Sequence, residues 1–188
     1  MPGSRISLTR LQKLGLVKET VRRYTDILQT AFLITRIGAW QPGLGSRVVQ
    51  TPKVYLTDNG LLAHLPGADA RRAADDSQVT GKLYENFVAM EVARLLEGAE
   101  TSAIQYHYRG YHGEEIDVVL EDRAGRIACI ECKTAASLGS SDYRPMAQLR
   151  DARGDQFVAG IVLYTGADTV PLGDRLWAVP VSALWTPR

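Results

Sequence analysis

Four residues of the sequence have the types and spacing of a hydrolytic site: Glu85, Asp117, Glu131 and Lys133. Asp117 stands in the middle of a predicted strand, where aspartate is disfavoured. Glu131 and Lys133 are two residues apart at the end of the next predicted strand, so both project from one face. Such a pair can be an ordinary ion pair, which contributes little. Two linked strands that each direct a carboxylate to one place favour a functional cluster.

Glu85 adds a third carboxylate from a predicted helix over residues 80–96. A rotation of about 100° per residue places it on the same stripe as apolar residues such as Val88. A carboxylate within an apolar stripe is costly unless it is paired or binds a metal. A salt bridge to Lys82 or Arg94 at the edge of the stripe is the alternative interpretation.

Clustered carboxylates predict a site for Mg²⁺, with Mn²⁺ as its substitute, because hard oxygen ligands suit these cations. Hydrolysis of a phosphodiester needs a shielded phosphate, a hydroxide near neutral pH and a stabilised leaving group, and such a cation supplies all three. We expect Asp117 and Glu131 to bind the metal and Lys133 to position the attacking water. Glu85 would bind a second metal, or hold the first through water.

Zinc chemistry is disfavoured. The only cysteines, Cys129 and Cys132, are three residues apart on a predicted strand, so their thiols point to opposite faces. His64, His107 and His112 show no ligand spacing. His107 shares a strand face with Gln105 and Arg109 and could touch a phosphate, but a satisfied surface histidine is the favoured interpretation.

The elements expected to position the four residues form an α/β core of helix, three-strand meander, helix and strand, with a short terminal strand. Thr80 is the expected N-cap of the first helix, and Ser140, Ser141 or Asp142 that of the second, with Pro145 in its first turn. Arg123-Ala124-Gly125 predicts a tight turn between antiparallel strands. The predicted ranges are 80–96, 104–108, 115–121, 126–133, about 140–152, 158–164 and 176–179.

A second unit precedes this core. Apolar spacing predicts helices over 8–14 and 18–30, followed by strands over 32–39 and 53–56 and a short helix capped by Asp58. This order is typical of a winged helix, truncated because only two helices precede the strands. The expected domains are therefore residues 1–65, a polar connector 66–79, and the core 80–188.

Basic charge is concentrated at the N-terminal end. Residues 1–53 hold nine Lys or Arg against two acidic residues, whereas residues 54–188 hold thirteen against nineteen. Lys18, Arg22 and Arg23 on the second predicted helix could contact DNA phosphates. A solvated helix face, or a face that packs on another module, explains them as well.

With 188 residues and 45% apolar content, the chain can bury one good core and a small second unit. No apolar run approaches the roughly 18 residues that a membrane span requires. The N-terminus lacks the pattern of a secretory signal. We therefore expect a cytoplasmic protein without a membrane partner.

Glu85, Ile116-Asp117 and Glu131-Cys132-Lys133, on helix, strand and strand, resemble the PD-(D/E)xK nuclease superfamily, with Ile in place of Pro. The resemblance implies a restriction-endonuclease-like core, and it places Gln148 where some of these nucleases hold a glutamine near the metal. Four further segments resemble the C-terminal region of a large family of prokaryotic AAA-type ATPases: Leu14 to Tyr24, Pro52 to Leu61, Gly81 to Val88 and Gly113 to Val119. In that family, a winged helix and a nuclease-like domain follow the ATPase module.

No G-x-x-x-x-G-K-[ST] motif occurs, so the ATPase module that the resemblance implies as a partner is missing from this sequence. The sequence looks like the C-terminal part of such a protein, as a fragment or a truncated gene. The expected function is Mg²⁺-dependent hydrolysis of a nucleic acid, with DNA favoured. The alternatives are a catalytically silent DNA- or protein-binding module, and a regulator in which only the basic helix matters.

Overall fold

A tight turn organises the central hairpin of the protein. Asp122 accepts hydrogen bonds from the backbone N–H groups of Ala124 and Arg126, and Gly125 has a φ of 74°. These contacts reverse the chain between β4 (Glu115–Glu121) and β5 (Ile127–Lys133), which pair antiparallel as the sequence predicts. The computed structural model describes residues 17–41, 51–64, 76–110 and 113–186.

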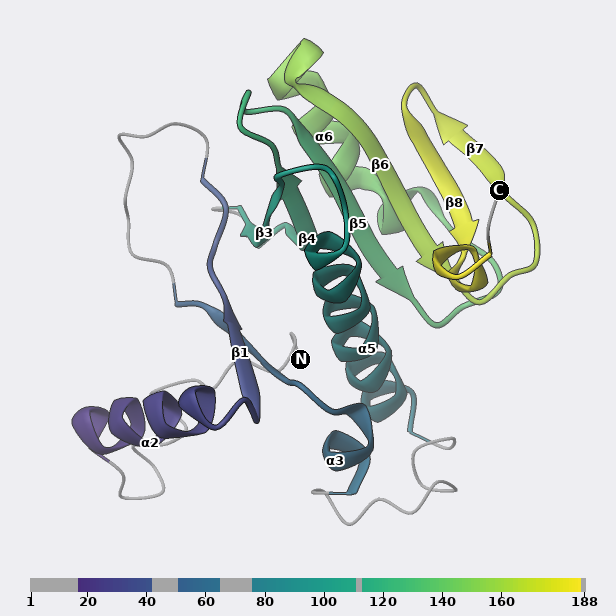
Figure 1. Cartoon of the computed structure of the whole chain (residues 1–188). Coiled ribbons are helices and arrows are strands. Elements are labelled where there is room, and N and C mark those ends of the chain that lie inside the picture. Colours follow the sequence, from purple (N-terminus) through teal and green to yellow (C-terminus); the bar gives the residue numbers. More distant parts are fainter. Residues whose placement is uncertain (1–16, 42–50, 65–75, 111–112, 187–188) are drawn as a thin grey trace.

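Six strands form one mixed sheet in the order β3-β4-β5-β6-β8-β7 (Figure 1). The antiparallel meander β3–β4–β5 is joined by parallel β6 and β8, and β7 closes the sheet antiparallel to β8. The remaining strands are β3 (Ile104–Arg109), β6 (Phe157–Tyr164), β7 (Val170–Gly173) and β8 (Leu176–Pro180). Strand β7 was not predicted from the sequence, because its Pro171 and Gly173 are typical of a turn.

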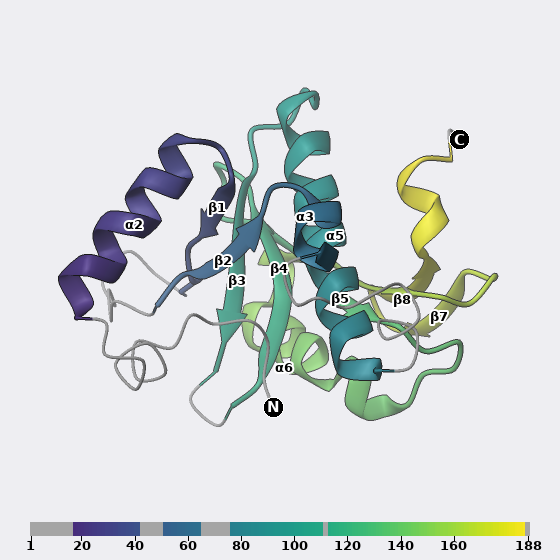
Figure 2. The same cartoon turned by 90° about the horizontal axis from the view of Figure 1, so that it is seen from below.

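One long helix covers each face of this sheet (Figures 1 and 2). Helix α5 (Ser77–Glu97) buries Val88, Ala89 and Val92 in one apolar cluster. Helix α6 (Arg144–Arg153) buries Met146 and Leu149 in a second cluster on the opposite face. The expected α/β layering is therefore present, with helix, meander, helix and strand in the predicted order.

Two predicted helix starts are wrong. Asp76, and not Thr80, caps α5, because its carboxylate accepts the backbone N–H groups of Gln78 and Val79 that no earlier turn can satisfy. Before α6, residues Ser140–Asp142 form a separate 3₁₀ turn, η1, and no side chain caps the helix itself. Pro145 lies in the first turn of α6 as expected.

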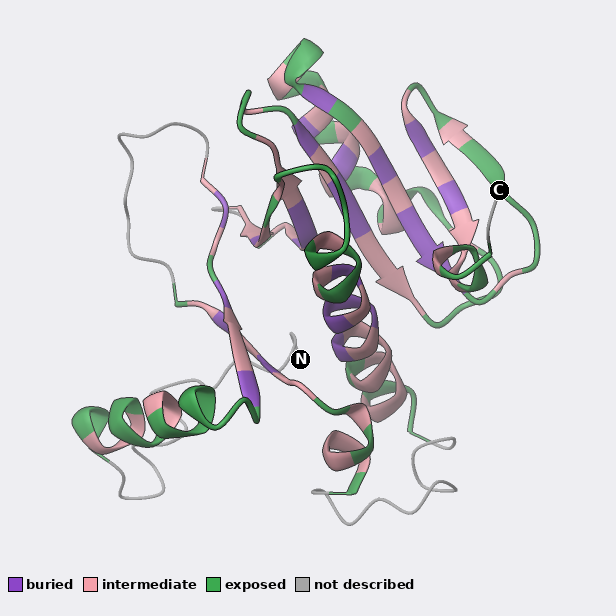
Figure 3. Cartoon of the chain, in the orientation of Figure 1, coloured by how far each residue is buried: buried purple, intermediate pink, exposed green. Residues whose placement is uncertain are grey.

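The N-terminal unit contains α2 (Lys18–Thr30), an antiparallel pair of strands, β1 (Ile34–Ile37) and β2 (Lys53–Leu56), and a short helix, α3 (Asn59–His64). Asp58 accepts a hydrogen bond from the Leu61 N–H and so caps α3 as predicted. Helix α2 buries none of its residues (Figure 3). The predicted helix over 8–14 lies outside the described residues.

This unit is packed into the core. After β1, the chain runs parallel to β3: the Trp40 N–H donates to the His107 carbonyl at 2.6 Å, and the His107 N–H donates to the Gly38 carbonyl at 3.0 Å. Trp40 is buried in the cluster under α6, whereas Ile37 and Tyr55 are buried in the cluster under α5. The N-terminal unit therefore contributes side chains to both cores.

Candidate active site

A β-bulge in β4 positions Asp117. Register between β3 and β4 shifts by one residue, so Asp117 and Val118 together lie opposite His107. Such bulges re-aim side chains next to functional sites. In a regular strand Ile116 and Val118 would share one face, and the sequence alone predicts that arrangement, but it is wrong: Ile116 lies in the cluster under α6 and Val118 in the cluster under α5. The extra residue causes the difference.

The Asp117 side chain also takes the place of a backbone hydrogen bond between β4 and β5. Backbone pairing between β4 and β5 runs from Glu121 and Ile127 to Val118 and Ile130. Beyond that point the Asp117 carboxylate accepts the N–H of Cys132 at 3.1 Å. The aspartate thus lies where the two strands stop pairing, between the two faces of the sheet.

Glu85 reaches the same place from α5. Its Oε1 accepts hydrogen bonds from Lys53 Nζ at 2.7 Å and from the Tyr55 hydroxyl at 3.0 Å. Lys53 Nζ also donates to Asp117 Oδ1 at 3.0 Å. One ammonium therefore bridges two of the predicted site carboxylates, and all three groups are largely buried, with side-chain exposures of 5% for Lys53, 12% for Glu85 and 14% for Asp117.

The sequence analysis missed Lys53, which lies within this charged cluster. It lies on β2, two residues before Tyr55, so both side chains project from one strand face toward Glu85. A lysine at the end of a predicted wing strand gave no local signal of burial. The available signal was a deficit of charge, since three clustered carboxylates faced the single predicted cation Lys133.

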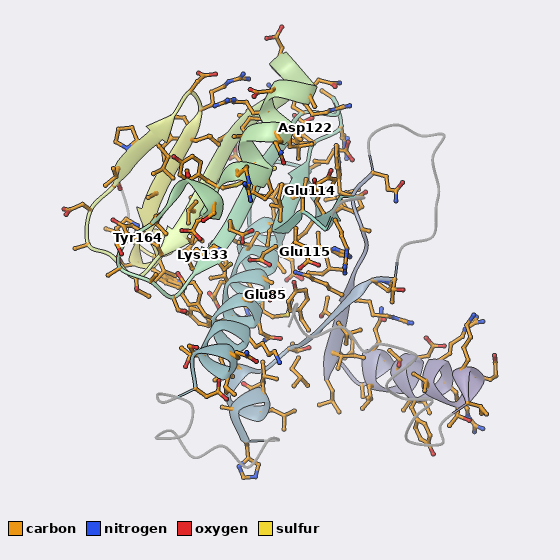
Figure 4. All side chains as sticks on the ribbon, turned by 180° about the vertical axis from the view of Figure 1, so that it is seen from behind. Glu85, Glu114, Glu115, Asp122, Lys133 and Tyr164 are labelled. Carbon is orange, nitrogen blue, oxygen red and sulfur yellow. The ribbon has the colours of Figure 1, made fainter. Side chains whose placement is uncertain are left out.

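Glu131 and Lys133 form a second ion-pair group on the face toward α6. Lys133 Nζ lies 3.0 Å from Glu131 Oε1 and 3.7 Å from Asp142 Oδ1. Asp142, in η1, was considered only as a helix cap. Lys133 is 31% exposed, which makes it the most accessible of the four predicted residues. Figure 4 shows Glu85 on α5 and Lys133 at the end of β5.

Burial and mutual repulsion perturb the carboxyl groups. Burial, followed by the negative charge of Asp117, raises the pKa of Glu131 to about 8, against the opposing effect of Lys133. Burial and Asp117 also raise the pKa of Glu85. Burial by itself would lower the pKa of Lys53, but the charges of Asp117 and Glu85 outweigh it, so its pKa is raised and it stays protonated.

His107 belongs to the buried surroundings of the site. Its exposure is 1%, so the favoured interpretation as a surface histidine is wrong. The bulge and the segment at Gly38 to Trp40 enclose it, because this segment pairs with the backbone of His107. Burial lowers the pKa of His107 to about 4, and the charge of Lys53 acts in the same direction, so the imidazole is neutral at pH 7.

The donor set matches a hard divalent cation in type, since carboxylate oxygens are its preferred ligands. Glu85 and Asp117 already share a cation, the ammonium of Lys53. Within the described ranges, however, no three His, Cys, Asp or Glu side chains surround one point as a metal-binding group. The residues fit a cation between Glu85 and Asp117, provided that the Lys53 ammonium leaves that position.

The other predicted contact residues are exposed on two helices. Lys18, Arg22 and Arg23 are exposed on α2, where Arg22 lies 4.0 Å from Asp26. Gln148 is exposed on α6. Cys129 and Cys132 contribute to opposite apolar clusters, as the strand periodicity predicts.

The chain belongs to the family described as domain of unknown function DUF4143, whose pattern matches residues 80–184. Residues 1–72 match a second family, described as domain of unknown function DUF8612. The uncharacterized proteins Rv2008c of Mycobacterium tuberculosis and Mb2031c of Mycobacterium bovis are each 30% identical to the chain over 176 residues, or 93% of its length. The chain spans 38% of each relative. No solved structure matches it.

Among the described residues, the longest helix, α5, is too polar to cross a bilayer, and no other helix combines the necessary length and apolar character.

Proposed function

We propose that this chain hydrolyses phosphodiester bonds of a nucleic acid, with DNA as the expected substrate, through a site that depends on Mg²⁺ or Mn²⁺. The observation that carries the proposal is the convergence of charged groups from α5, β4 and β5 where β4 and β5 stop pairing. Lys53 links Glu85 to Asp117, and the charge of Asp117 acts on Glu131. Buried like charges of this kind are expensive to maintain and are concentrated at functional sites.

The order of elements supports this assignment. Helix α5, the meander β3–β4–β5, helix α6 and strand β6 follow the order expected of a restriction-endonuclease-like core. Helix α2 with the strand pair β1 and β2 supports a partial winged helix. The relatives are much longer than this chain, which leaves room in those proteins for the ATPase module that the resemblance implies.

Each residue has a role that follows from its position. Asp117 and Glu85 would hold the cation at the place that the Lys53 ammonium occupies, and Glu131 would complete the site with Asp117 from the face toward α6. A divalent cation at this point would shield the phosphate, lower the pKa of a bound water and stabilise the leaving oxygen. Lys133, the most accessible of the charged groups in the cluster, would orient the attacking water. Exposed Lys18, Arg22 and Arg23 would hold the backbone of the nucleic acid.

A second candidate function is a nuclease-fold module that binds nucleic acid or protein without turnover. The observation that favours it is Lys53, which already pairs with both Glu85 and Asp117 without a metal. In that case the charged cluster would serve only to join β2 to the core.

Cleavage assays on single- and double-stranded DNA and RNA, in Mg²⁺ and in Mn²⁺, distinguish the two functions. We expect Asp117→Asn and Lys133→Met each to reduce cleavage by at least about a hundredfold, the usual scale for losing a group that transfers or positions a proton. Lys82→Met, on the exposed side of α5, is the matched control and should leave the rate unchanged. Background cleavage in every condition, with no metal bound in calorimetry, would leave the silent module as the function.

A further inference from the structure

We infer that Lys53 is a built-in counter-cation of the site, and that a divalent metal ion binds only by displacing its ammonium from between Glu85 and Asp117. The N-terminal unit would then regulate the site, because β2 carries the lysine. The inference rests on the proposed function, since it concerns the same metal site.

The geometry makes Lys53 more than a surface ion pair. Its Nζ lies 2.7 Å from one carboxylate oxygen and 3.0 Å from the other, and its side chain is 5% exposed. The two acids lie 32 and 64 residues further along the chain, on different elements. A buried carboxylate without a partner costs several kcal/mol. In the absence of metal, Lys53 therefore stabilises two acids that would otherwise repel each other.

The same position suits a divalent cation. Lys53 brings one positive charge to two carboxylates, whereas Mg²⁺ or Mn²⁺ brings two and would balance them completely. Both cations require the oxygens that the ammonium now occupies, so the lysine and the metal compete for one place. The competition should make metal binding by the unaltered chain weak.

The surrounding contacts allow the ammonium to leave while β2 stays in place. Tyr55 is buried and donates to Glu85. The Leu56 backbone is held through both its N–H and its carbonyl by the side chain of Asn86. Lys53 lies at the opposite end of this short strand, on a flexible four-carbon stem. Rotation of the stem is therefore the movement that would vacate the site.

The test compares Mn²⁺ binding and thermal unfolding of the unaltered chain with those of Lys53→Met and Lys53→Arg. In calorimetry, Lys53→Met should bind Mn²⁺ roughly tenfold more tightly, a typical size for two coupled binding events. In a chelator it should unfold at a lower temperature than the unaltered chain, and Mn²⁺ should restore its stability. Lys53→Arg keeps the charge and should bind Mn²⁺ as weakly as the unaltered chain. Lys82→Met is the control for loss of a lysine that lies outside the site.

The outcomes separate the inference from the proposed function. Equal Mn²⁺ affinities of the unaltered chain and Lys53→Met, both abolished by Asp117→Asn, would overturn the competition and leave the metal site intact. No binding by any variant would overturn both. If Lys53→Met folds only when Mn²⁺ is present, the result supports the inference that the metal ion and the Lys53 ammonium occupy the same place. If it folds in neither condition, while the more conservative Lys53→Gln folds and gains no affinity, Lys53 is a structural ion pair and the inference is wrong.

Discussion

At the scale of single residues, the carboxyl of Glu131 departs strongly from its ordinary chemistry. Burial and the charge of Asp117 raise its pKa from 4.5 to about 8, although Lys133 lies 3.0 Å away. In the absence of metal, Glu131 therefore holds a proton at neutral pH.

Glu131 makes the stability of the protein depend on pH. Between pH 4.5 and about 8 the folded state binds a proton at this position that the unfolded state has lost, so this contribution to stability falls as pH rises. Glu131→Gln removes the titrating group. We expect the free energy of unfolding of this variant, measured by urea denaturation in a chelator, to fall less across the same window. Parallel profiles for the two proteins would contradict the raised pKa.

The four residues chosen from the sequence carry charges that interact in the structure. They could be recognised because an acid in mid-strand or on an apolar stripe is energetically costly and therefore unusual. Lys53 and His107 were not identifiable in this way. Their burial is a product of tertiary packing: β2 turns Lys53 toward α5, and the segment at Gly38 to Trp40 encloses His107. Neither arrangement can be recognised from the spacing of residues along the sequence.

At the scale of elements, a buried amide on α5 holds the end of β2. The Asn86 side chain accepts the Leu56 N–H at 2.9 Å and donates to the Leu56 carbonyl at 2.9 Å and to Asn59 Oδ1 at 2.8 Å. The amide therefore supplies the partners that the Leu56 backbone groups would find in a further strand. This contact fixes the strand that carries Lys53 and Tyr55.

Asn86→Ala should consequently destabilise the folded protein. It leaves the part-buried N–H and carbonyl of Leu56 without partners, and each such loss costs about 1–3 kcal/mol. We expect a loss of about 2–4 kcal/mol in the free energy of unfolding, measured by urea denaturation. Faster amide exchange should be concentrated in β1 and β2. Gln78→Ala, at the exposed start of α5, should change stability by less than about 0.5 kcal/mol. An Asn86→Ala protein as stable as this control would show that the hairpin is held elsewhere.

Most helices and strands were predictable, because apolar periodicity and turn residues are local signals. Strand β2 and helix α2 have the predicted ends, and the β4–β5 hairpin follows from the turn at Gly125. The bulge at Asp117 was not predictable: an extra residue in one strand is defined only by the register of its partner. Strand β7 was missed because edge strands tolerate the proline and glycine that usually end a strand.

At the scale of the whole molecule, the N-terminal unit and the sheet share their cores and their charged site. Trp40 packs in the cluster under α6, Ile37 and Tyr55 pack in the cluster under α5, and Lys53 bridges Glu85 to Asp117. The family match at residues 80–184 covers the sheet and its two helices, but not these four N-terminal side chains. The sequence predicted the order of the two units and gave no indication of this shared packing.

A fragment of residues 76–188 should therefore fold poorly. It lacks Trp40, Ile37 and Tyr55, and burial of each such side chain contributes about 1.5–3 kcal/mol, so the combined loss approaches the total stability of a typical domain. It also leaves Glu85 and Asp117 without Lys53. We expect low-temperature unfolding, binding of an apolar dye and rapid amide exchange in β3 and α5. Replacement of Tyr24, Ile27 and Leu28 by alanine in the intact chain is the matched control, because α2 buries none of these apolar side chains, and this variant should unfold close to the temperature of the unaltered chain. A 76–188 fragment as stable as that control would mean that the sheet and its two helices form an independent domain, and that the N-terminal side chains only cover a core that is complete without them.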